Sequence, residues 1–503
     1  MDFSNAYVDR IIHKNRAEYN RLLKRALACK DADERIDRLW DASFQAAKKT
    51  CGFYSAPELE NALADTALLL KGPVRESFEP NSFLHVFTET YLGGGHTQVA
   101  MRWIEASPTG QKHSVFISTQ SDESEIPARL KEAVSVRGGT FTVLDPRAKA
   151  AERALKLREH ASGFETVILH VHPEDVLPVL AFASPDFKRP VVLFNHADHL
   201  YWTGGTVADL VVNFRTFASG FNETYRKITR NTVLPLPVNE PSLSSPWRRL
   251  AVRKELGIPA DGKIMLSVAS SYKYTPFDGL DFARTARRVL DRVPDSYLVV
   301  VGPAADEPYW SEAAQASGGR IKVLGMLPFT KLEPYFQASD LILDSFPFNS
   351  FTAFFDGAKY NIPTLSLQTP LGHTDTHEES GVSCATQEEL AERAVNLLQN
   401  PPEGDTRVYE LLRDNQFPQG FKRRLEALYN SFPAEHRMYP PQPDGPRAVT
   451  EFERFVEKNL QAKPVSAKEK RKRFKRALFW CKWGKRERLI RLLGITLYSR
   501  KFH

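Results

Sequence analysis

The sequence predicts an α/β protein built from two consecutive parallel sheets. Short apolar runs recur at intervals of roughly 20 to 30 residues, and helical stretches separate them, as in βα units. The series is interrupted once, by the proline- and serine-rich stretch 234–247, which has the composition of a linker. The 503 residues are also too many for a single core, so two or more folded units are expected.

The elements are expected in four segments. Residues 1–78 carry helical periodicity and no strand pattern, which predicts a helical N-terminal segment. The first sheet is expected within 79–238, with strands near 83–89, 113–118, 139–145, 165–171, 189–195 and 208–214. The second sheet is expected within 239–430, with strands near 262–270, 295–302, 319–325, 340–346 and 362–367. The remaining segment, 431–503, predicts a crossover followed by a basic amphipathic helical tail.

The positive charge of the chain is concentrated in that tail. From Lys468 to His503 there are 14 Lys or Arg and 2 Glu, a local net charge of +12. Because the whole chain carries +7, the rest of the protein carries −5. A basic, aromatic-rich tail predicts contact with an anionic membrane surface, and packing of the tail onto the protein is the main alternative. A nucleic-acid partner is not expected.

Composition favours a cytoplasmic protein. No apolar run approaches the ~20 residues of a membrane span, and the N-terminus lacks an apolar signal core. The four cysteines fit neither a zinc spacing nor a disulfide framework, which favours a reducing compartment. Within the cytoplasm, the tail is further expected to bind the protein peripherally to the inner face of the plasma membrane.

A glycine turn lies between the first expected strand and its helix. Gly93, Gly94 and Gly95 allow a tight turn and a close approach of a ligand to the backbone. His96 follows at the expected helix N-terminus, where a strand end of such a sheet places ligand contacts. A plain tight turn with an incidental histidine is the competing interpretation.

A second polar cluster follows the strand near 189–195. His196, Asp198 and His199 lie together at this strand end. Lining of a substrate site is the favoured interpretation, loop capping is an alternative, and a metal site is disfavoured because no further clustered ligand is evident beside these side chains.

The second sheet has two candidate anion contacts. Lys273 comes just past the end of an expected strand, where a cation can meet a phosphate. Thr352 is expected in the first turn of a helix, where free amides favour phosphate, and Asp356 lies one turn further on. A surface lysine, a capping Ser350 and a surface acid are the competing interpretations.

These stretches resemble the nucleotide-binding motifs of the O-GlcNAc transferase family. The pattern N-x-x-T-x-x-x-D is matched by Asn349, Thr352 and Asp356, with Pro363 seven residues later, and the upstream Y-K-x-x-P by Tyr272, Lys273 and Pro276. The resemblance implies that Lys273 and Thr352 contact the diphosphate of a UDP-sugar and that Asp356 holds its ribose. It covers mainly residues 260–370, and the tetratricopeptide array of that family is not present ahead of it.

More broadly, residues 83–430 are similar to GT-B glycosyltransferases, which implies two Rossmann-like domains. The implied activity is transfer of a hexosyl or N-acetylhexosaminyl group from a nucleotide-sugar, most simply a UDP-sugar, to a hydroxyl or amide. The implied acceptors are a surface glycan, a glycolipid, a lipid-linked glycan or a protein, as in related bacterial cytoplasmic enzymes. No cofactor and no metal are implied, because such enzymes stabilise the leaving group with basic side chains and helix N-termini.

The candidate site residues follow from both arguments. His96, His196 and His199 are the candidates for the base that deprotonates the acceptor, and they are not ranked. The candidate donor-binding residues are Gly94, Gly95, Lys273, Asn349, Ser350, Thr352, Asp356, His373 and Thr374. The last two lie in the polar loop after the strand near 362–367. A nucleotide-sugar epimerase of the same fold and a non-catalytic, membrane-associated binding protein are the alternative functions.

Overall fold

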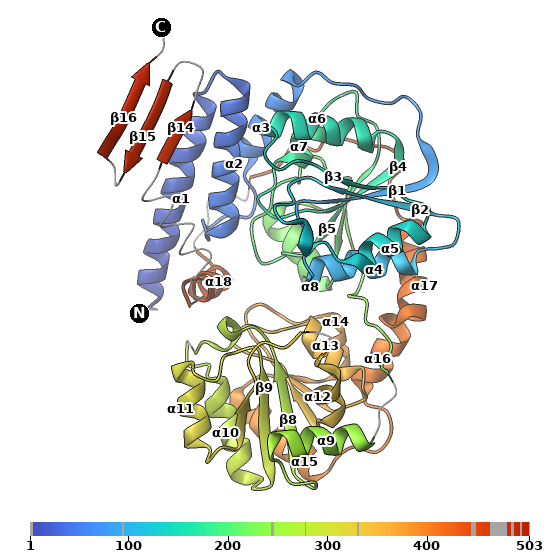
Figure 1. Ribbon diagram of the computed structural model, residues 1–503, viewed down its shortest axis with the longest axis vertical. Coiled ribbons are helices and arrows are strands. Elements are labelled where there is room, and N and C mark those ends of the chain that lie inside the picture. Colours follow the sequence, from blue (N-terminus) through green and yellow to red (C-terminus); the bar gives the residue numbers. More distant parts are fainter. Residues whose placement is uncertain are drawn as a thin grey trace. The chain divides into compact units, whose positions relative to one another are not determined.

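The computed structural model describes residues 4–92, 95–242, 246–276, 278–328, 331–443, 449–462, 480–483, 487–492 and 495–501. The chain forms two compact units, Met1–Asn459 and Leu460–His503. The larger unit contains both expected parallel sheets, each with helices packed on it (Figure 1). The α/β prediction with two Rossmann-like sheets is therefore confirmed.

Three helices form the N-terminal segment, as the periodicity predicts: α1 (Asn5–Leu27), α2 (Ala32–Lys48) and α3 (Pro57–Leu69). Asp31 caps α2 by accepting a hydrogen bond from the Glu34 amide. Buried leucines of this segment, among them Leu39 and Leu63, share one apolar core with the first sheet. The segment is thus a layer on the N-terminal half and not a separate domain.

The first sheet has seven strands in the order β3-β2-β1-β4-β5-β6-β7. Each neighbouring pair of strands in it runs parallel. Its strands are β1 (Glu79–Phe87), β2 (Lys112–Ile117), β3 (Phe141–Val143), β4 (Phe164–His170), β5 (Val191–Asn195), β6 (Leu210–Asn213) and β7 (Asn231–Val233). Its α-helices are α4 (Gly95–Ala106), α5 (Ala128–Val136), α6 (Ala150–Ala161), α7 (Leu177–Phe182) and α8 (Thr216–Phe221). The short edge strand β7 was not expected from the sequence.

The second sheet has six strands in the order β10-β9-β8-β11-β12-β13. Its strands are β8 (Lys263–Val268), β9 (Ser296–Val301), β10 (Ile321–Val323), β11 (Leu341–Leu343), β12 (Thr364–Leu367) and β13 (Ser383–Cys384). Its α-helices are α9 (Pro246–Leu256), α10 (Phe282–Arg292), α11 (Pro308–Ala316), α12 (Glu333–Ala338), α13 (Thr352–Ala358), α14 (Asp375–Ser380) and α15 (Gln387–Gln399). In both sheets the strand order reverses beside the first strand, between β1 and β4 and between β8 and β11, and ligands of such sheets bind at this point.

The chain then returns to the first half through α16 (Arg407–Asn415) and α17 (Pro418–Tyr429). α17 packs against α4, and the Trp103 indole donates a hydrogen bond of 2.8 Å to the Tyr429 hydroxyl. The last helix of the series, α18 (Glu451–Ala462), is tied to α1 by an ion pair between Arg454 and Asp9 at 2.8 Å. Among the described residues, no helix is both long and apolar enough to cross a membrane.

The tail differs from the expected helix. Beyond α18, its described residues form three antiparallel strands, β14 (Trp480–Trp483), β15 (Glu487–Leu492) and β16 (Ile495–Lys501). The segments are short, rich in aromatic and branched residues, and separated in the sequence by Gly484 and Gly494, which favours strands over a continuous helix. Residues 463–479, which carry much of the expected basic face, lie outside the described part of the chain.

Candidate functional site at the strand ends

The carboxyl ends of the two sheets are brought together within the larger unit. Arg215, directly after β6 and its short turn, donates from Nη1 to the carbonyl oxygens of Leu371 at 2.7 Å and Gly372 at 3.0 Å, just past β12. The ring of His199, past β5, meets that of Phe348, past β11, edge to face at 5.5 Å between centroids. The loops that follow the strands of both halves therefore form a single polar region, as expected for ligand sites of parallel sheets.

Lys273 lies in a short 3₁₀ turn, Ser271–Tyr274, immediately after β8. Its ammonium group donates a hydrogen bond of 2.8 Å to the carbonyl oxygen of Asn349 and lies 5.0 Å from the centre of the Phe348 ring. The Phe348 amide in turn donates to the Lys273 carbonyl at 3.2 Å. The loops after β8 and β11 are thereby held together, at the place where the strand order of the second sheet reverses.

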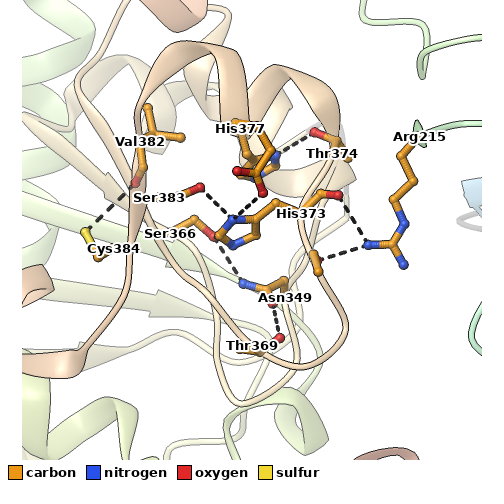
Figure 2. A network of polar contacts seen from close by, with 12 residues as sticks. Arg215, Asn349, Ser366, Thr369, His373, Thr374, His377, Val382, Ser383 and Cys384 are labelled. Atoms are coloured by element: carbon orange, nitrogen blue, oxygen red, sulfur yellow. Dashed lines mark hydrogen bonds and ion pairs between the residues drawn. The ribbon is translucent and has the colours of Figure 1, made fainter. Parts of the chain in front are cut away.

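The side chain of Asn349 is directed into the protein. Its amide nitrogen donates to Asp344, Ser366 and the Leu367 carbonyl, and its oxygen accepts from Thr369 at 2.9 Å (Figure 2). The side chain is fully buried. Because both ends of the amide are engaged internally, the residue shapes the loop, and its backbone oxygen is the atom that meets Lys273.

Ser350 also turns back into its own loop. Its amide and hydroxyl both donate to the same carboxylate oxygen of the buried Asp344, at 2.9 and 2.6 Å. The next residue, Phe351, has a φ of 50° and precedes α13. Thr352 is exposed at the first position of α13, in the place that the sequence predicted.

Asp356 is nearly buried and lies 3.6 Å from the Lys359 ammonium on the same helix. Burial raises the pKa of the Asp356 carboxyl, while the charges of Lys359 and Arg102 act against that rise. Arg102 belongs to α4 of the first half, so Asp356 lies near groups from both halves. The predicted ribose contact thus has a basic partner that the sequence did not reveal.

His373 and Thr374 belong to a buried polar network (Figure 2). The His373 ring is bonded through Nε2 to the Leu367 carbonyl at 3.0 Å and through Nδ1 to the Ser383 hydroxyl at 2.6 Å. The Thr374 hydroxyl is bonded to Nδ1 of His377 at 2.6 Å. Burial lowers the pKa of His373 and of His377, so both rings are neutral near pH 7.

His96 and His196, two of the three candidate bases, lie side by side in the structure. Their rings stack at 5.0 Å, and His96 at the N-terminus of α4 is bonded to the Glu89 carbonyl at 3.2 Å. Burial lowers the pKa of His96 to about 4 and that of His196 well below its usual value. Gly95 begins α4 at an exposed position where an added Cβ would meet nothing within 4 Å, and Gly93 and Gly94 lie outside the described residues.

His199 has different surroundings. Its Nδ1 lies 3.5 Å from a carboxylate oxygen of Asp198, and 24% of its side chain is exposed. Asp198 is buried, and its second oxygen accepts a hydrogen bond of 2.6 Å from Nε of Arg215. Burial alone would raise the pKa of Asp198, but the Arg215 charge and the contact with His199 outweigh it and keep that pKa below its usual range.

Arg215 is the residue that the sequence analysis missed. It is 1% exposed and lies within 5.3 Å of the ring centres of Phe214, Phe217 and Phe351. An arginine at the end of an apolar run, in "LVVNFR", was the available signal. Within the described residues, no group of three or more His, Cys, Asp or Glu side chains is arranged to hold a metal ion.

The architecture is that of the GT-B class: two parallel α/β sheets with helices on them and their ligand ends brought together. Solved structures agree. A mutant of the O-GlcNAc transferase from Thermobaculum terrenum matches with a TM-score of 0.50 at 14% identity, over 89% of this chain and 83% of that chain. Anabaena HepE in complex with UDP and glucose matches with a TM-score of 0.51 at 12% identity, over 70% of this chain and 100% of that chain.

At these identities the similarity shows the fold, and the resemblance to GT-B enzymes is confirmed at that level. The chain matches no protein-family model, and the comparison with curated proteins found no match.

Proposed function

We propose that this protein is a glycosyltransferase that takes its sugar from a UDP-sugar. The observation that carries the proposal is the meeting of two sets of strand ends: Lys273 and the 344–356 segment on one side, and His199 with Asp198 on the other. The fold likeness to O-GlcNAc transferase and to HepE, the latter in complex with UDP and glucose, supports the choice of donor.

The donor is proposed to bind along the second half. Lys273 neutralises charge on the diphosphate, the exposed Thr352 offers a hydroxyl and a first-turn amide, and Asp356 accepts a hydrogen bond from the ribose. Asn349, Ser350, His373 and Thr374 support these contacts by fixing the loops, because their side chains are engaged within the protein.

Transfer requires a base on the acceptor side. The acceptor hydroxyl or amide attacks the anomeric carbon, its proton passes to an imidazole nitrogen, and the bond from that carbon to the UDP oxygen breaks with its electron pair leaving on UDP. His199 fits this role best, since the nearby Asp198 carboxylate can orient the ring and stabilise the imidazolium that forms. Lys273 would take up the charge that develops on the leaving UDP.

The remaining details extend the proposal. The transferred group is a hexosyl or N-acetylhexosaminyl group, and the acceptor belongs to a surface glycan, a glycolipid or a protein. The proposal needs no metal, because the chain's own lysine meets the leaving group. Peripheral attachment at the inner face of the plasma membrane, through the basic tail, is part of the same proposal.

A screen of UDP-, GDP- and CMP-sugars tests the proposal. Thermal stabilisation and slow hydrolysis are expected with one UDP-sugar, with release of UDP, and both should be lost in Lys273→Ala. Lys254, an exposed lysine on α9 of the same half, provides the matched control, and Lys254→Ala should behave like wild type. Stabilisation by no nucleotide-sugar, or equal effects of the two substitutions, would count against a donor site at Lys273.

A further inference from the structure

Arg215 connects the two halves through its guanidinium group. It leaves the first half just after β6 and reaches three successive carbonyl oxygens of the loop after β12, those of Leu371, Gly372 and His373. Figure 2 shows the Arg215 side chain directed at this loop. The three distances are 2.7, 3.0 and 3.5 Å. On its own side it donates to Asp198 at 2.6 Å. A buried cation is thus shared between a carboxylate of one half and backbone oxygens of the other.

Aromatic rings from both halves enclose the same group. Phe217 of α8 lies 4.6 Å from the guanidinium carbon, and Phe351 of the second half lies 5.1 Å from it. Ring faces shielded from solvent stabilise a cation placed over them. Removing the charge would therefore loosen packing from both sides of the junction.

Two neighbouring contacts support the junction. The amide and the hydroxyl of Thr216 both donate to the Asp375 carboxylate, at 3.0 Å in the shorter amide contact and 3.0 Å for the hydroxyl. Gly372 has a φ of 68°, and a Cβ added there would lie 2.9 Å from the Phe217 ring. The loop therefore approaches α8 so closely that only glycine fits without displacement.

A line of contacts runs from His199 to Lys273 through this junction. His199 faces Asp198, Asp198 pairs with Arg215, and Arg215 holds the 371–373 carbonyls. His373 of that loop bonds to the Leu367 carbonyl, which also accepts from Asn349. The Asn349 backbone oxygen then accepts from Lys273. The candidate base and the candidate phosphate contact are thus linked through the connection that Arg215 makes.

We propose that Arg215 is a positioning residue that holds the loop of the candidate base, 196–199, in register with the donor loop, 369–375. The catalytic consequence rests on the proposed function, whereas the joining of the two halves does not. Arg215 contacts neither the sugar nor the diphosphate in this proposal. It acts by keeping His199 and Lys273 in one arrangement, so its loss should reduce transfer far more than binding of UDP.

Arg158 provides the matched control. It is equally buried, at 2% exposed, and also donates to backbone carbonyls, those of Ala181, Leu70 and Leu180. All of these lie on the N-terminal side, so Arg158→Lys introduces the same chemical change with no effect on the junction. Gly372→Ala perturbs the junction from the other half without altering the buried cation. It is the second variant to measure if Arg215→Lys fails to fold.

The first measurement is the distance between the two halves. It is measured between spin labels attached at the exposed positions Glu132 of α5 and Glu312 of α11, in full-length protein whose native cysteines have been replaced. We expect Arg215→Lys and Gly372→Ala to broaden the distance distribution at least twofold, and Arg158→Lys to leave it unchanged. Wild-type distributions in both junction variants would overturn the proposal. This readout needs no substrate, so it stands even if no nucleotide-sugar binds and the proposed function fails.

The second measurement separates binding from transfer. With the UDP-sugar identified in the screen, Arg215→Lys and Gly372→Ala should lower kcat at least tenfold, while calorimetry shows UDP affinity within threefold of wild type. Arg158→Lys should change neither value more than twofold. A purely structural role would instead reduce kcat in proportion to stability in all three variants, and that result would overturn the positioning role.

Discussion

Lys273 is held in place by the segment that follows β11. Its ammonium group meets the Asn349 carbonyl and the Phe348 ring, both contributed by the neighbouring loop. The side chain is therefore oriented before a ligand arrives, which reduces the conformational entropy lost on binding. A charge fixed in this way can act on a leaving group without reorganisation.

Lys273→Ala should lower turnover at least tenfold, which corresponds to about 1.4 kcal/mol of lost transition-state stabilisation. Stability should change little, because one partly exposed hydrogen bond is lost. Steady-state kinetics and a thermal melt of the purified variant check both statements. Turnover at the wild-type rate would remove Lys273 from the donor site.

His199 and His96 differ in what surrounds them. His199 has the Asp198 carboxylate beside it, whereas burial lowers the pKa of His96 to about 4 and makes it a weak base. His199→Ala should therefore lower kcat at least hundredfold, and His96→Ala should have a smaller effect. UDP affinity should stay within threefold in both, as measured by calorimetry. A larger loss in His96→Ala would assign the base to His96.

At the scale of the element, α13 combines a predicted ligand contact with a structural ion pair. Asp356 and Lys359 are one turn apart, and both side chains are largely buried. Only 12% of the Asp356 side chain and 9% of the Lys359 side chain are exposed, so solvent stabilises either charge only weakly. A substitution at Asp356 therefore affects both folding and binding, and the two effects must be separated.

Asp356→Ala should destabilise the protein by about 2 kcal/mol, because it leaves the Lys359 charge buried without its partner. The double variant Asp356→Ala/Lys359→Met should recover most of that loss in urea unfolding. If Asp356 holds the ribose, UDP affinity should be at least tenfold weaker in both variants. Recovery of UDP affinity together with stability would show that Asp356 is only a structural residue.

At the scale of the whole molecule, several histidines of the first sheet and its loops are buried in an uncharged state. His113, His85 and His170 form a chain across β2, β1 and β4, with hydrogen bonds of 3.0 Å between successive rings. Burial lowers the pKa of His85 to about 3 and that of the other two well below the usual value. His96 and His196 are shifted in the same direction.

Stability should therefore fall as the pH is lowered from about 6.5. The unfolded chain binds protons on these histidines below that pH, whereas the folded chain resists protonation until the pH approaches the lowered pKa values. Each such histidine costs about 1.4 kcal/mol per pH unit within this window. Thermal melts between pH 8 and pH 4 should show a steep loss of Tm below pH 6.5. The control variant His13→Gln, which removes an exposed histidine, should show the same dependence of Tm on pH as the wild type. A Tm that does not change with pH would contradict the burial of uncharged rings.

The sequence by itself determined the local order of the fold. The alternation of apolar runs and helical stretches predicted eleven of the thirteen strands of the two sheets, and missed only the short edge strands β7 and β13. It also placed Lys273 just past a strand end and Thr352 in the first turn of a helix, because the ends of apolar runs and the starts of helices are local features. The strand-rich tail was missed, since short segments with mixed charge fit a helix or a strand equally well.

Only the tertiary structure decided which polar side chains face inward and how the two halves meet. Asn349 and His373 look like ligand contacts in the sequence, but partners 10 to 20 residues away bury them. Arg215 acquires its role from carbonyl oxygens more than 150 residues further along the chain. Such contacts depend on how loops distant in the sequence meet, and a pattern that repeats every two or four residues carries no information about those meetings.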